Sequence, residues 1–122
     1  MDAQLAQEID LLYNRICHAL GDPKRLLILY ALARQPRYVS ELAEELNIPQ
    51  PTVSRHLKVL RERCLVAASR EGAAVYYALV DERVIQALDL LRAVVRDRLL
   101  EQARLAEFAA LDTGFETEED RS

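Results

Sequence analysis

The stretch from residue 50 to residue 63 reads QPTVSRHLKVLRER. Its apolar side chains recur at the helical steps of four and three: Val53, Leu57 and Leu60. Pro51 suits a first helical turn, where its missing N–H costs nothing. A residue before a proline avoids the helical region, so Ile48 and Gln50 are expected to be extended and the helix to begin at Pro51. The stretch predicts one helix with an apolar inner face and a polar, basic outer face.

A short helix and a tight turn precede this stretch. Ser40 is expected to cap a helix over Glu41–Leu46, and Asn47-Ile48-Pro49 forms the turn. Two helices joined in this way, with the second one basic on its outer face, are typical of the helix-turn-helix, which places its second helix in the major groove of DNA. A polar helix face by itself indicates no more than solvation, so the function prediction needs the charge pattern and the segment that follows.

Charge is unevenly distributed along the chain. The net charge of −4 disfavours contact with a polyanion. However, five of the acidic residues lie in a C-terminal tail that has only one base, Arg121. These acids are Asp112, Glu116, Glu118, Glu119 and Asp120. Between residues 50 and 70 the only acid is Glu62, and the bases are Arg55, Lys58, Arg61, Arg63 and Arg70. Local patches govern contact with phosphates, so this segment is expected to be attractive to a polyanion.

The outer face of the predicted helix carries side chains that suit contact with DNA. Arg55 and Lys58 neutralise phosphates or pair with guanine, and Gln50 pairs with adenine. Hydroxyl and imidazole groups bond to base edges or phosphates. The residues expected to contact DNA, from the helix and the segment after it, are Gln50, Thr52, Ser54, Arg55, His56, Lys58, Arg61, Arg70 and Gly72.

A β-hairpin is expected directly after the helix. Leu65–Arg70 and Val75–Val80 are rich in strand-favouring residues, and the four residues Glu71-Gly72-Ala73-Ala74 separate them. Its position suits a wing that touches the minor groove or the DNA backbone through Arg70 and the amides near Gly72. The tyrosines of the second strand, Tyr76 and Tyr77, are interpreted as packing residues rather than as platforms for stacked bases.

Two helices are expected before this region. The first has a stripe of apolar residues, Leu5, Ile9, Leu12 and Ile16, and is expected to end at Leu20 with Gly21 in the left-handed conformation. Asp22 then caps a second helix that ends before Gln35-Pro36-Arg37. This second helix is apolar nearly all round and is expected to be the centre of the core, through Leu26, Leu27, Leu29, Tyr30 and Leu32.

A long helix over Glu82–Ala110 is expected to end the folded part of the chain. It carries one stripe of Val84, Leu88, Leu91, Val95 and Leu99 and a second set of Ile85, Leu100, Leu105 and Phe108. So long an apolar helix in a chain of 122 residues needs a partner. We expect one domain over residues 1–111 and a disordered acidic tail over 112–122. No signal peptide or membrane span is apparent, which predicts a soluble, cytoplasmic protein.

Three motifs in order resemble the ArsR/SmtB family of bacterial repressors: residues 19–29 (ALGDPKRLLIL), residues 50–61 (QPTVSRHLKVLR) and residues 70–77 (REGAAVYY). The resemblance implies a mainly α winged helix-turn-helix with a small hairpin wing. It further implies a homodimer that is held by the first and last helices, binds a palindromic double-stranded DNA operator and releases it when an inducer binds. The corresponding interface residues are Leu5, Ile9, Leu12, Ile16, Leu88, Leu91, Val95 and Leu99. Two departures are Pro49, where the family usually has a capping residue, and the neutral wing tip at Ala73 and Ala74.

The usual metal sites of that family are not expected in this chain. The helix over residues 41–46 has no cysteine, and no histidine follows His56. Cys17, His18 and Cys64 remain, and three interpretations stay open for them: structural residues, thiols that sense redox state, or a metal or metalloid site. Under the structural interpretation Cys17 is buried and Cys64 ends the recognition helix at some strain.

Other function classes are weaker. No catalytic motif is apparent, so neither an enzyme nor a cofactor is expected, and the effector is unknown. The competing hypothesis is a winged helix that binds protein instead of DNA. Such a module would not need a basic recognition helix.

Overall fold

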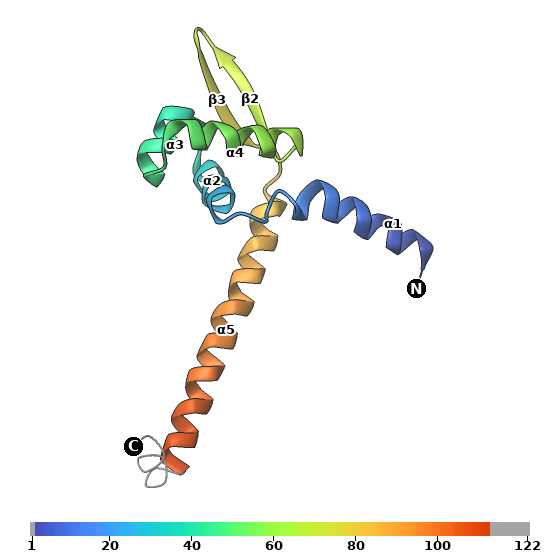
Figure 1. Ribbon diagram of the computed structural model, residues 1–122, viewed down its shortest axis with the longest axis vertical. Coiled ribbons are helices and arrows are strands. Elements are labelled where there is room, and N and C mark those ends of the chain that lie inside the picture. Colours follow the sequence, from blue (N-terminus) through green and yellow to red (C-terminus); the bar gives the residue numbers. More distant parts are fainter. Residues whose placement is uncertain (1, 113–122) are drawn as a thin grey trace. The chain divides into compact units, whose positions relative to one another are not determined.

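The computed structural model describes residues 2–112, which fall into two compact units divided between Ile85 and Gln86. In chain order the elements are α1 (Ala3–Leu12), the π-helical turn η1 (Tyr13–Cys17), α2 (Pro23–Arg34), β1 (Arg37–Tyr38), α3 (Val39–Leu46), α4 (Gln50–Glu62), β2 (Val66–Glu71), β3 (Ala74–Leu79) and α5 (Arg83–Asp112) (Figure 1). The predicted fold class, mainly helical with a small β-hairpin, is confirmed. No helix within residues 2–112 is long and apolar enough to cross a membrane. The tail predicted to be disordered lies, from residue 113 on, outside the described residues.

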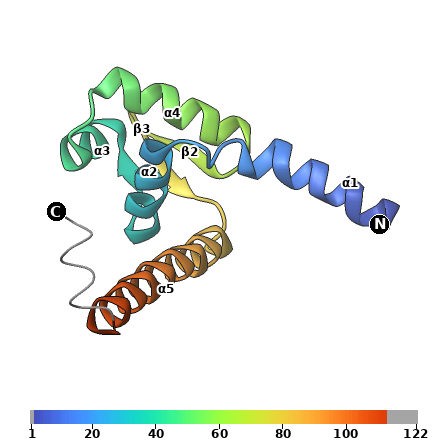
Figure 2. The ribbon, with the colours of Figure 1, turned by 60° about the horizontal axis from the view of Figure 1, so that its bottom comes forward.

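The core of the first unit lies where α2, α3 and α4 meet the hairpin (Figures 1 and 2). Its fully buried large side chains are Ile28, Leu29, Leu42, Val53, Leu57 and Leu60. Asp22 caps α2 as predicted, because its carboxylate accepts the backbone N–H groups of Lys24 and Arg25. Leu27 was expected in the core but is 51% exposed. The core therefore covers only one side of α2.

The start of α3 differs from the prediction. The helix begins at Val39, with Tyr38 as its N-cap residue, and Ser40 is exposed rather than capping. The Tyr38 N–H donates to the Glu41 carboxylate over 2.8 Å, which satisfies one of the backbone donors left free at a helix start. Glu41, the third residue of the helix, thus takes the capping role that was predicted for Ser40.

The turn between α3 and α4 relies on a left-handed asparagine. Asn47 adopts φ 55°, a conformation that asparagine tolerates better than most residues. The prediction that Gln50 is extended is wrong, because α4 already begins at Gln50. Pro49 is the cap residue, and its carbonyl accepts the N–H groups of Thr52 and Val53 over 3.0 and 3.1 Å. The steric restriction on the residue before Pro51 therefore does not keep Gln50 out of the helix.

The hairpin belongs to a three-stranded antiparallel sheet with the order β1-β3-β2. Strands β2 and β3 pair with Ser69 opposite Tyr76, and a turn at Gly72 and Ala73 joins them. Gly72 adopts φ 63°, which a glycine reaches without strain. Strand β1 was not predicted, because two residues are too few to show an alternating pattern.

The segment between α1 and α2 also differs from the prediction. The first helix does not continue regularly to Leu20: after Leu12 it widens into η1 and then unwinds through tight turns. Within these turns the N–H of Gly21 bonds to the carbonyl of His18 over 3.3 Å. Gly21 does not adopt the left-handed conformation, since a chain that unwinds in this way needs no left-handed terminator. Cys17, expected to be buried, is exposed.

The start of α5 is stabilised by Asp81. Its carboxylate accepts the backbone N–H of Arg83 over 2.9 Å and the guanidinium over 2.7 Å. These hydrogen bonds from Arg83 lower the pKa of Asp81 to about 2. The helix then runs for 30 residues to Asp112, two residues beyond the predicted end.

Arg63 is the C-cap residue of α4, and Cys64 follows it in the left-handed conformation with φ 62°, where a Gly terminator would be typical. The N–H of Cys64 bonds to the carbonyl of Arg61 over 3.0 Å. A Cβ at such a position costs about 1–2 kcal/mol, part of which a glycine recovers. We therefore expect Cys64→Gly to raise the free energy of unfolding by about 1 kcal/mol in urea denaturation. Cys64→Ala keeps the Cβ and is the control; an equal gain in both variants would contradict the strain argument.

Candidate nucleic-acid interface

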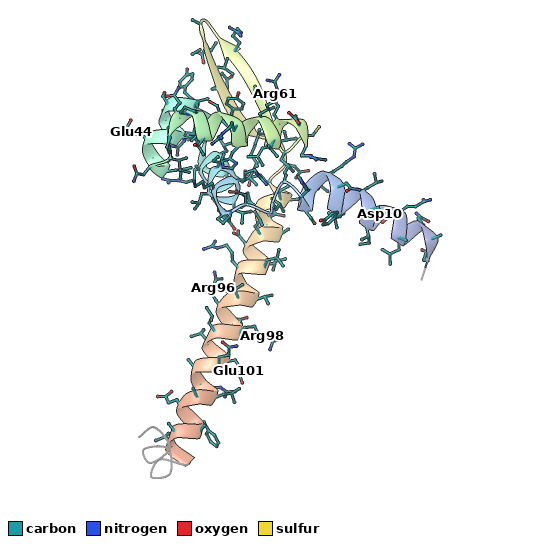
Figure 3. The ribbon with its side chains drawn as sticks, viewed as in Figure 1. Asp10, Glu44, Arg61, Arg96, Arg98 and Glu101 are labelled. Carbon is teal, nitrogen blue, oxygen red and sulfur yellow. The ribbon has the colours of Figure 1, made fainter. Side chains whose placement is uncertain are left out.

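Helix α4 has two faces with opposite character. Val53, Leu57 and Leu60 are completely buried, as predicted. With about 100° of rotation per residue, Arg55 and Lys58 lie opposite this core side and Ser54 and Arg61 lie beside it, and all four side chains are exposed. Arg61 is exposed near the end of α4 (Figure 3). We call these four residues the outer face of α4. The core side anchors the helix, so the outer face is presented on a rigid element.

Arg55 is held in place by a neighbour on its own helix. Its guanidinium donates to the Thr52 hydroxyl oxygen over 3.1 Å. Thr52 is half-buried at the edge of the outer face. Because its hydroxyl oxygen accepts this bond, it orients the Arg55 guanidinium, and the hydroxyl proton can still be donated. An arginine oriented in this way presents several donors in a fixed plane, which suits phosphate oxygens or the guanine edge.

The wing places further polar groups beside the start of α4. Gln50 is exposed and lines an open groove of about 470 Å³ together with Tyr38 and Val75. Arg70 and Gly72, near the tip of the hairpin, are exposed. The predicted wing residues are therefore accessible, and Arg70 is the base that the hairpin offers among the described residues 66–79.

His56 is the exception among the predicted DNA contacts. Its side chain is only 15% exposed. Its Nδ1 lies 3.4 Å from a guanidinium nitrogen of Arg25, and its Nε2 lies 3.9 Å from the Asp22 carboxylate. The imidazole therefore faces α2 and the segment before it rather than the outer face of α4.

The charges around His56 act on its protonation and on that of Asp22. Burial lowers the pKa of His56 below its ordinary value, and Arg25, Lys24 and Arg55 lower it further, against the attraction of Asp22. Burial would raise the pKa of Asp22, but the N–H groups of Lys24 and Arg25, followed by the charges of His56 and Arg25, hold it below its ordinary value. The structure thus favours a neutral imidazole beside a charged carboxylate.

Sequence reasoning missed the roles of two arginines. The Arg25 Nε donates to the carbonyl of Ala19 over 2.6 Å, and another of its nitrogens donates to the carbonyl of His18 over 3.3 Å. Arg63, counted in the basic segment, donates to the carbonyl of Asn14 over 2.5 Å. The contact of Arg63 with Asn14 could not be predicted from local sequence, because the two residues are 49 positions apart in the chain.

The two cysteines are free and exposed. Within residues 2–112 no three side chains of the histidine, cysteine, aspartate or glutamate type are grouped so as to hold a metal ion. The structure therefore does not bring Cys17, His18 and Cys64 together as a three-ligand site in one chain.

Most of the apolar residues expected at a dimer interface are exposed in the single chain. In the first unit no residue of α1 is buried: Leu5 is 43% exposed, Ile9 50% and Leu12 45%, while Ile16 in η1 is half-buried. In the second unit, the row on α5 comprises Leu91 (61%), Val95 (58%) and Leu99 (60%). Leu88 differs, because it is already buried in the single chain.

Proteins of known family are similar to this chain in sequence. Residues 22–67 match the bacterial regulatory protein family arsR. The regulator CmtR of Mycobacterium bovis is 42% identical over 96 residues, which cover 79% of this chain and 81% of CmtR. An uncharacterised HTH-type transcriptional regulator of Methanocaldococcus jannaschii is 42% identical over 76 residues, which cover 62% of this chain and 85% of that regulator.

The fold is also similar to that of solved proteins. The homodimeric winged helix-turn-helix DNA-binding domain Mb0332 of Mycobacterium bovis superposes with a TM-score of 0.68 at 31% identity, over 81% of this chain and 91% of that domain. The matched proteins are transcriptional regulators rather than enzymes. With its winged helix-turn-helix and its matches over most of each relative, this chain belongs to the ArsR family of DNA-binding transcriptional regulators.

Proposed function

We propose that the protein is a homodimeric repressor that binds a palindromic operator through the outer face of α4 and the wing. The observation that carries this proposal is the two-sided character of α4. Its core side is completely buried at Val53, Leu57 and Leu60, while the bases Arg55, Lys58 and Arg61 are exposed around the rest of the helix. A rigid helix with basic residues on its free face suits the major groove.

Dimerisation is supported by the exposed apolar residues of α1 and α5. The row of Leu91, Val95 and Leu99 is more than half exposed, and a contiguous apolar surface of this kind marks an interaction site. The similar domain Mb0332 is described as homodimeric. Because a two-fold symmetric dimer presents two copies of α4, its DNA site has two symmetric half-sites.

The first test is binding to DNA from upstream of the protein's own gene, measured by fluorescence anisotropy at several salt concentrations. We expect Arg55→Ala to weaken binding by about 1–3 kcal/mol, or roughly fivefold to 150-fold. If Arg55 contacts phosphate, the slope of log affinity against log salt should fall by about one unit. If it reads a base, the preference at one operator position should relax instead.

Arg104→Ala is the matched control. It removes the same charge from an exposed site on α5, where Arg104 pairs only at the surface with Glu101. A general effect of net charge would weaken both variants alike. The proposal would be refuted if Arg55→Ala bound the operator with the affinity of the wild type, or if the wild type bound no such DNA. A reporter gene behind the operator then distinguishes repression from activation.

A further inference from the structure

His56 joins the DNA-reading helix to the segment that connects α1 with α2. We propose that His56 is a positioning residue: together with Arg25 and Asp22 it sets α4 for operator binding, touches no DNA, and releases this hold when the imidazole is protonated. The inference rests on the proposed DNA-binding function. It reassigns a residue that the sequence predicted as a DNA contact.

The hydrogen-bonding capacity of the partners determines the state of the imidazole. A guanidinium has only donors, so the Nδ1 that lies 3.4 Å from Arg25 must be an acceptor. The single proton of the neutral ring then sits on Nε2, which points toward the Asp22 carboxylate 3.9 Å away. One neutral tautomer therefore suits both neighbours at once.

Arg25 extends this link beyond α4. The same guanidinium donates to the carbonyls of His18 and Ala19, which lie directly after η1. At the C-terminal end of α4, Arg63 donates to the carbonyl of Asn14 within η1. Two contacts thus connect α4 to the segment that follows α1: the first is His56 with Arg25, in the middle of the helix, and the second is Arg63 with Asn14, just beyond its end. Because α1 is expected at the dimer interface, a shift of this segment is transmitted to the outer face of α4.

Protonation of His56 breaks its contact with Arg25. A doubly protonated ring has no lone pair for Arg25, and its charge faces Arg25, Lys24 and Arg55, with Asp22 as the opposing charge. The pKa of His56 lies below its ordinary value of 6.5. The stabilisation from the neutral ring is therefore fully present above pH 6.5 and is lost as the pH falls through the pKa of the folded protein.

The pH dependence of operator binding tests the link. Between about pH 7.5 and pH 5.5 we expect the wild type to lose roughly tenfold in affinity. His56→Gln should lose much less, because its amide accepts from Arg25, donates toward Asp22 and does not titrate. His18→Gln is the matched control, since it replaces the side chain of the only other histidine, which is exposed, and keeps the backbone carbonyl that accepts from Arg25. An identical pH profile for the wild type and His56→Gln would overturn the proposal.

A second variant separates positioning from direct contact. We expect His56→Ala to weaken operator binding roughly tenfold at neutral pH while leaving the salt slope and the base preference unchanged. A salt slope lowered by about one, a relaxed base preference, or unchanged affinity would each overturn the positioning role. Circular dichroism at the assay temperature verifies that the variant is folded.

The link can also be measured without DNA. In an NMR titration of the free protein, Arg25→Gln should raise the pKa of His56, because a cation beside the ring is removed. The His56→Gln variant identifies the resonance. An unchanged pKa would overturn the Arg25–His56 contact whatever the DNA results are. Conversely, failure of the wild type to bind DNA at any pH would refute the proposed function and leave this contact standing.

Discussion

Replacing Leu91 with glutamate is expected to leave the protein monomeric and to weaken operator binding at least about a hundredfold. Leu91 is 61% exposed in the row that also contains Val95 and Leu99. A carboxylate in an apolar interface must be desolvated without a partner, which opposes association. Binding of two half-sites by one dimer gains its strength from the connection between the two reading helices, and a monomer loses that gain.

Analytical ultracentrifugation at micromolar concentration and anisotropy with a two-half-site operator measure the two effects. Gln86→Glu adds the same charge at an exposed position on another side of α5, five residues away and thus about 140° around the helix. It should behave as the wild type. A Leu91→Glu variant that still sediments as a dimer would show that this row is not the interface.

Replacing Leu57 with alanine is expected to lower the free energy of unfolding by about 2–5 kcal/mol. Leu57 is completely buried on the core side of α4, so its removal loses apolar burial and leaves a cavity. Since a small domain is stable by only about 5–15 kcal/mol, this loss is a large share of the total.

Urea denaturation followed by circular dichroism, at one fixed protomer concentration because of the expected dimer, measures this loss. Val59→Ala is the control on the same helix, because Val59 is only half-buried and removes less buried surface. Equal losses in the two variants would contradict the assignment of Leu57 to the anchoring side.

The outer face of α4 was predictable because helical periodicity is a local property. The steps between Val53, Leu57 and Leu60 assign an inner side, and Arg55 and Lys58 follow on the outer side without knowledge of the rest of the fold. His56 shows where that argument ends. Its position on the helix leaves it between the two sides, and its partner Arg25 is 31 residues away in the chain.

The boundaries of elements were predicted less well than their existence. The helix start at Val39 depends on a side-chain bond from Glu41 that competes with the serine cap. The first helix ends in a π-helical turn rather than at a left-handed Gly21, because the backbone N–H groups after Leu12 take other acceptors than in a regular helix, such as the bond from His18 to the carbonyl of Tyr13. Such local choices are decided by what packs around them.

By itself, the sequence determined the order of the helices, the hairpin after α4 and the basic outer face of α4, because apolar periodicity, caps and local charge are encoded in residues close together in the chain. Only the tertiary structure decided that His56 faces Arg25 and Asp22, that Arg63 holds η1, that Cys17 is exposed and that a third strand pairs with β3. Each of these facts depends on the placement of one element against another or on what surrounds it. Burial and pairing between distant residues follow from the packed core and cannot be inferred from spacing alone.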